Sequence, residues 1–168
     1  MALKNTLIYL PADNFDRAAF DEASKLAHRA TRVYYVTLTK TNARVKEGLR
    51  PFGADPAKFA FLDAITPKLF PATPPPDCDY LESVDDPTHL ATAIADAMRS
   101  READTLVLDS LSWLLTYHKE AGLLTFLRVL LAHLDTVQSR NVFFALTADA
   151  NTKAFLAIKP LMQEVLAW

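Results

Sequence analysis

The chain has 168 residues, of which 51% are hydrophobic, and its 18 Lys and Arg residues stand against 20 Asp and Glu residues. This length suits one well-buried domain and excludes a large multidomain enzyme. The net charge of −2 disfavours nucleic-acid binding through a basic surface, and the single cysteine, Cys78, excludes an internal disulfide framework. Apolar stretches such as residues 123–131 are too short to span a membrane, so we expect a cytoplasmic protein that contacts no membrane.

The first half of the chain alternates short apolar runs with amphipathic segments. Runs rich in β-branched and aromatic residues predict strands, and apolar residues at helical spacing, such as Ala19, Ala23 and Leu26, predict helices. The predicted strands are 5–10, 32–38 and 58–65, and the predicted helices are 15–30 and 42–49.

Residues 67–87 contain six of the ten prolines. Because proline lacks the N–H that helices and sheets need, we expect an extended surface loop without a regular element. The segments on either side are too small to fold alone. The loop therefore belongs to a single domain of residues 1–168.

The second half continues the alternation. Helix is predicted for 88–99 and 122–137 and again from about Thr152, with an interruption at Pro160, and strand is predicted for 105–108 and 141–146. Residues 164–168 fit either a helix or a strand.

Five apolar strands that alternate with helices predict a three-layer α/β/α sandwich around a mostly parallel sheet. In such a sheet the carboxyl ends of the strands share one edge, which is where ligands bind. Polar residues follow several of these strands, and we take them as the candidate ligand crevice: Asp63, Asp109, Ser110, Thr147 and Asp149.

Glycine is rare: the chain contains only Gly48, Gly53 and Gly122, whereas about 7% is usual. Loops that cradle phosphate need clustered glycines, and the sequence contains neither GxxxxGK followed by Ser or Thr nor GxGxxG. The usual phosphate-binding loops are therefore excluded.

Three predicted strands end in polar motifs: FLDAIT, TLVLDSLSWLL with Asp109 at its strand end, and FFALTAD. The order of these segments resembles the KaiC-like branch of the RecA superfamily, in which the second motif corresponds to the Walker-B strand. Residues 86–149 are similar to small archaeal domains of unknown function that are related to KaiC and lack a phosphate loop. The resemblance implies a RecA-like sheet.

The departures from that family concern catalysis. Where the family has its glycine-rich loop and lysine, this chain has PADNFDRAAF, whose Asp13 and Asp16 would repel phosphate. The second strand ends in TLTK, where an active ATPase of the family carries glutamates. We therefore expect a protein that is not an enzyme, because phosphoryl transfer depends on positioning and charge stabilisation. The cations of residues 40–50, which include Lys40, could contact an anion, but we assign them to the commoner alternative, a solvated helix face.

No cofactor or metal is expected from the remaining polar residues. The four histidines lack the spacing of a zinc site, and neighbouring acids disfavour a reactive Cys78 thiolate.

The helix predicted at 122–137 carries more apolar residues than one sheet-facing stripe needs. It is either a central helix packed on several sides or part of an interface. The candidate interface residues are Trp113, Leu115, Leu124, Phe126 and Leu131.

The sequence thus favours a non-catalytic RecA/KaiC-like domain that acts as a regulatory or signal-transduction module through a protein partner or a homodimer. The alternative is a small-molecule or nucleotide-binding protein that uses the strand-end crevice without a phosphate loop.

Overall fold

The structure is a computed structural model, and it describes residues 4–168. Its core is a seven-stranded sheet with the strand order β4-β3-β2-β5-β6-β1-β7, and every neighbouring pair is parallel. The strands are β1 (Lys4–Leu10), β2 (Val33–Thr37), β3 (Phe59–Asp63), β4 (Cys78–Tyr80), β5 (Thr105–Asp109), β6 (Arg140–Leu146) and β7 (Glu164–Ala167).

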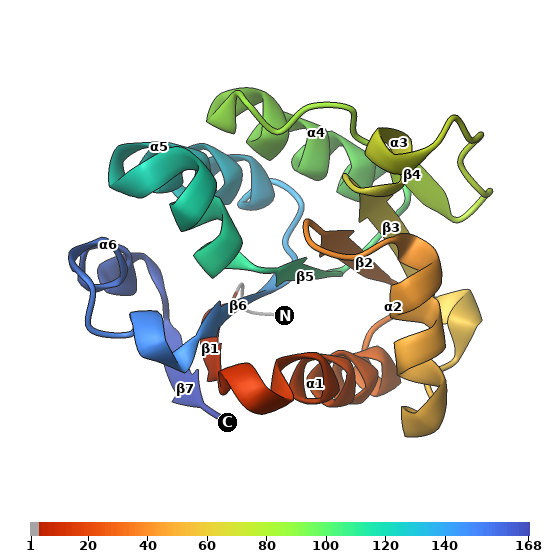
Figure 1. Ribbon diagram of the computed structural model, residues 1–168, viewed down its shortest axis with the longest axis horizontal. Coiled ribbons are helices and arrows are strands. Elements are labelled where there is room, and N and C mark those ends of the chain that lie inside the picture. Colours follow the sequence, from red (N-terminus) through yellow and green to blue (C-terminus); the bar gives the residue numbers. More distant parts are fainter. Residues whose placement is uncertain (1–3) are drawn as a thin grey trace.

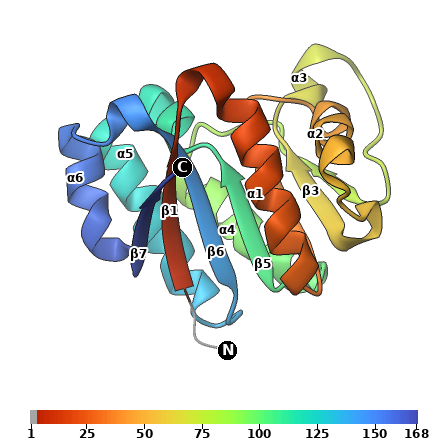
Figure 2. The same cartoon turned by 90° about the horizontal axis from the view of Figure 1, so that it is seen from below.

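Helices cover both faces of the sheet (Figure 1), as the sequence predicted. One face is covered by α4, α5 and α6, and the other by α1 and α2; Figure 2 looks onto the face that α1 crosses. The helices are α1 (Phe15–Arg29), α2 (Asn42–Leu49), α3 (Thr66–Leu69), α4 (Pro87–Ser100), α5 (Leu111–Leu134) and α6 (Lys153–Ile158). The three-layer α/β/α architecture is therefore confirmed.

The count of five strands was wrong, because both outermost strands are short. β7 pairs with β1 through four residues, and β4 pairs with β3 through three. β4 and α3 lie in the proline-rich segment, which was expected to hold no regular element. Proline removes a donor only at its own position, so residues 78–80 remain free to pair with an existing strand.

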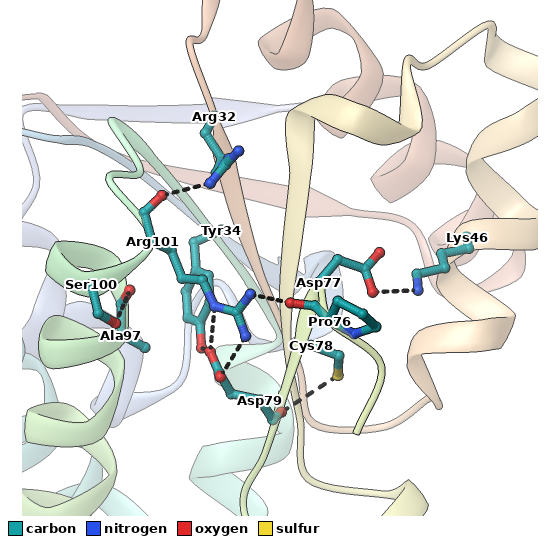
Figure 3. Close-up of polar contacts among 10 residues, drawn as sticks. All are labelled: Arg32, Tyr34, Lys46, Pro76, Asp77, Cys78, Asp79, Ala97, Ser100 and Arg101. Atoms are coloured by element: carbon teal, nitrogen blue, oxygen red, sulfur yellow. Dashed lines mark hydrogen bonds and ion pairs between the residues drawn. The ribbon is translucent and has the colours of Figure 1, made fainter. Parts of the chain in front are cut away.

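β4 is anchored at its centre (Figure 3). The Asp79 carboxylate accepts two hydrogen bonds from the Arg101 guanidinium, at 2.7 and 3.2 Å, and one from the Tyr34 hydroxyl at 3.0 Å. Arg101 also donates to the carbonyl of Pro76. Arg101, the residue that follows α4, thus ties the proline-rich segment to the sheet.

α5 begins at Leu111, well before the start predicted at Gly122. The Ser110 hydroxyl caps it by accepting the N–H of Trp113 at 3.4 Å, and a non-helical residue, Lys119 (φ 60°, ψ −172°), interrupts it. Because α5 lies between α4 and α6 in one layer (Figure 1), it packs apolar residues on several sides. Within residues 4–168, no helix is long and apolar enough to cross a membrane.

Candidate functional site

A cleft of about 430 Å³ opens at the carboxyl ends of β2, β5 and β6. Its charged lining consists of Asp16, Lys40, Asp109 and Asp149, and its aromatic lining of Phe15 and Trp113. The rest of the lining is Thr39, Ser110, Ser112, Thr116 and Leu146. The parallel sheet brings these residues together from four separate segments.

Lys40 lies in the turn after β2, and local hydrogen bonds hold that turn. The Lys40 N–H donates to the Thr37 hydroxyl at 3.2 Å, and that hydroxyl donates to the Lys40 carbonyl at 2.6 Å. The Lys40 side chain is only 12% exposed. It therefore points back over the sheet, and its assignment to a solvated helix face was wrong.

The Lys40 ammonium has an acceptor for each of its three protons. It lies 3.0 Å from Oδ2 of Asp109, 3.0 Å from Oδ1 of Asp16 and 3.0 Å from the Thr39 hydroxyl. Burial by itself would lower the pKa of Lys40, but the Asp109 and Asp16 carboxylates outweigh it and raise that pKa. Lys40 is therefore a permanent cation whose donors are all used inside the protein.

Asp109 ends β5 and is fully buried. Its Oδ2 also accepts the Tyr35 hydroxyl at 2.8 Å, whereas its Oδ1 is buried without a hydrogen-bond partner in the described chain. Burial, and next the charge of Asp109, raise the pKa of Tyr35 well above its ordinary value, so Tyr35 remains a donor. Asp109 is thus an anion that the protein balances with Lys40.

The hydroxyl groups of Ser110 and Ser112 form hydrogen bonds that hold the backbone around the cleft. Ser110 caps α5, and Ser112 Oγ accepts the N–H of Leu146 at 2.8 Å, which joins the start of α5 to the end of β6. Within residues 4–168, neither hydroxyl forms a hydrogen bond with a histidine or another base. These serines position the walls of the cleft.

Asp63, also taken as a crevice residue, does not line the cleft. Its buried carboxylate accepts hydrogen bonds from the Asn42 N–H and side-chain amide at 2.7 and 2.8 Å, from the Thr66 N–H and hydroxyl at 2.9 and 2.5 Å, and from the Ile65 N–H at 2.8 Å. Burial alone would raise the pKa of Asp63, but the hydrogen bonds from Thr66 and Asn42 outweigh it and lower that pKa. Asp63 therefore fixes the starts of α2 and α3.

The two crevice residues predicted at the end of β6, Thr147 and Asp149, differ in their relation to the cleft. Asp149 lines the cleft, whereas Thr147 is exposed and outside its lining. Both belong to one 3₁₀ turn, Thr147–Asp149. Asp109, Ser110 and Asp149 are the predicted crevice residues that the fold brings together.

The candidate interface residues lie against the protein's own core. Phe126 is completely buried, so it was wrongly assigned to an interface. The other four are partly buried and pack on the same apolar cluster beneath α4, α5 and α6: Trp113, Leu115, Leu124 and Leu131. This arrangement favours the central-helix alternative for α5.

Cys78 is buried on β4. Burial first, and next the charge of Asp63, raise the pKa of its thiol to about 12. Among residues 4–168, no group of three or more His, Cys, Asp or Glu residues could hold a metal ion.

Sequence reasoning missed Lys40, Phe15 and Trp113 as cleft residues. Lys40 lies two residues beyond the predicted strand 32–38, at the same edge of the sheet as Asp109, and this position was a usable signal. The two aromatic residues carry no comparable signal, because residues at helix starts are turned toward a sheet edge only by the packing of their helices.

The comparisons with known proteins agree with this architecture. A model of a family described as "Family of unknown function (DUF7504)" matches residues 10–167, and no curated protein matches. Among solved structures, the KaiC-like protein PH0186 from the hyperthermophilic archaeon Pyrococcus horikoshii OT3 is 13% identical, with a TM-score of 0.67 over 98% of this chain and 70% of that chain. At this identity the likeness shows the fold alone, so the RecA/KaiC-like fold is confirmed.

Proposed function

The chain belongs to a family of unknown function, DUF7504, and on this premise we propose that it is a KaiC-like domain that does not hydrolyse nucleoside triphosphates. It acts by reversible binding, as a regulatory or signal-transduction module, and the strand-end cleft is its binding site.

The observation that carries this proposal is the position of Lys40. A lysine that serves a bound triphosphate must direct free N–H donors at the phosphate oxygens. The Lys40 ammonium instead donates to Asp109, Asp16 and Thr39, all at 3.0 Å. Releasing it would leave the buried Asp109 charge unpaired, which costs several kcal/mol.

The surroundings of Asp109 support the same proposal. A carboxylate that holds hydrated magnesium needs an oxygen that water can reach. One oxygen of Asp109 is held by Lys40 and Tyr35, and the other is buried. The RecA/KaiC-like proteins that this chain resembles bind phosphate between the first strand and the first helix; here Asp13 lies in that turn, Asp16 lies in the first turn of α1, and there is no glycine.

The test is a calorimetric titration with ATP and magnesium, together with an assay of phosphate release. We expect no saturable heat at millimolar nucleotide and no release above the buffer. Magnesium-dependent release that is lost in Asp109→Asn and kept in Asp96→Asn would overturn the proposal. Asp96 is a suitable control because it is an exposed residue of α4 that pairs with Arg99.

A further inference from the structure

The strand-end cleft has an excess of negative charge. Asp16, Asp109 and Asp149 line it, and Lys40 is its one cationic side chain. The starts of α1 and α5 each add about half a positive charge, which leaves roughly one uncompensated negative charge. This net charge repels anions, and the one cation, Lys40, has no free N–H donor with which to bind them.

Asp149 supplies the free carboxylate. It is half-buried and lines the cleft. Its carboxylate forms neither a hydrogen bond nor an ion pair with any of residues 4–168. Its charge still acts on its surroundings: burial, and next Asp149, raise the pKa of Tyr9. A cation in the cleft would give the Asp149 carboxylate an ion pair.

Two aromatic rings line the cleft, and they pack on opposite faces of the sheet. Phe15 is the first residue of α1, and Trp113 lies in the first turn of α5. Trp113 stacks on Tyr117 at a centroid distance of 5.1 Å, which holds its ring in place. Aromatic faces bind apolar groups and attract organic cations, including quaternary ammonium groups.

We propose that this cleft binds a small organic cation in which a protonated amine or quaternary ammonium is joined to an apolar or aromatic body. The cationic group lies at Asp149, and the body lies between Phe15 and Trp113. The volume of about 430 Å³ falls in the range of small-molecule sites, roughly 300–1,000 Å³. This inference rests on the proposed function, because a bound nucleotide would need the same space with the opposite charge.

The test compares matched probes by calorimetry. Tryptamine and indole-3-propionate share an indole body and differ in the sign of the charge, and agmatine and choline extend the cationic series. We expect saturable binding of tryptamine at least about tenfold tighter than that of indole-3-propionate, a difference that one added ion pair accounts for. Equal binding of the two indoles, or no saturable binding of any of the three cations, would overturn the inference.

Variants locate the site. Asp149→Asn should weaken tryptamine binding about tenfold, Trp113→Leu should weaken it for every probe, and Asp96→Asn should leave it unchanged. Trp113→Phe keeps an aromatic face and should keep most of the affinity, which separates a lost contact from a lost fold. Binding that ignores both Asp149→Asn and Trp113→Leu would contradict the assigned site.

The same samples are titrated with ATP and magnesium. If the amines fail and ATP also fails, the ligand class is wrong and the proposed function stands. If ATP binds and is hydrolysed, the proposed function fails as well. The two failures are therefore distinguishable.

Discussion

The Lys40 ammonium lies 3.0 Å from Oδ2 of Asp109, a carboxylate with no solvent exposure. The pair joins the turn after β2 to the end of β5 across the floor of the cleft. Because Tyr35 donates to the same oxygen at 2.8 Å, the buried anion is held by a cation and a hydroxyl. Asp109 is thus held by partners from the chain itself.

Breaking this pair should destabilise the protein. Lys40→Met keeps the apolar stem and removes the ammonium, which leaves Asp109 buried and unpaired, so we expect the free energy of unfolding to fall by about 3–5 kcal/mol. Urea denaturation measures the change. The control, Lys25→Met, removes an exposed lysine paired with Asp21 and Glu22 and should cost less than about 1 kcal/mol. Equal, small losses in the two variants would show that the buried pair contributes little.

Asp63 should contribute more to stability than a surface aspartate does. Asp63→Ala leaves the donors of Asn42 and Thr66 without their acceptor, and we expect a loss of about 3 kcal/mol at pH 7. The matched control is Asp55→Ala, which removes one exposed capping bond to the N–H of Ala57 and should cost about 1 kcal/mol. A loss for Asp63→Ala no larger than that of the control would contradict this structural role.

The contribution of Asp63 should depend on pH. Its pKa is lowered in the folded protein, because the hydrogen bonds from Thr66 and Asn42 outweigh burial. The stabilisation is therefore complete above the unfolded-state pKa of about 3.9 and is lost as the pH falls through the lower folded-state pKa. The difference in unfolding free energy between the parent and Asp63→Ala should be constant from pH 7 to pH 5 and shrink below about pH 4. A difference that grows on acidification would show the opposite sign of coupling.

Cys78 reports on the attachment of β4. Its thiol should react slowly with a disulfide reagent at pH 8, because it is buried and its pKa is raised to about 12. Asp79→Ala removes the partner of Tyr34 and Arg101, so β4 should open more often and the reaction should accelerate about tenfold or more. The control, Asp96→Ala, should react at the parent rate. An unchanged rate in Asp79→Ala would show that backbone pairing with β3 alone holds the strand.

Phe126 tests the role of α5. Because its ring is fully buried, Phe126→Ala should lower the free energy of unfolding by about 3–5 kcal/mol. Leu156→Ala, at a residue of α6 that is 53% exposed, should change it by less than about 1 kcal/mol. Comparable effects of the two changes would mean that the core beneath α5 is loosely packed.

Local sequence determined the layers of this protein. Apolar runs such as residues 106–108 are buried in strands because they contain no polar side chain to place in water, and the spacing in residues 15–30 gives a helix with one apolar face. The alternation of the two requires parallel strands, which places Asp109, Ser110 and Asp149 near one edge of the sheet. The central part of the fold and three residues of the cleft lining follow from such patterns.

The tertiary structure alone decided what each of these residues does. Asp63 and Asp109 both end buried strands and are alike in sequence, yet Asp63 meets the donors of Asn42 and Thr66 whereas Asp109 meets Lys40. β4 is a strand only because the edge of β3 offers unpaired backbone groups to its three residues. A side chain's partners come from segments distant in the sequence. The pattern of neighbouring residues determines which face of a segment is buried. The packing of the whole chain determines which charged side chains form pairs.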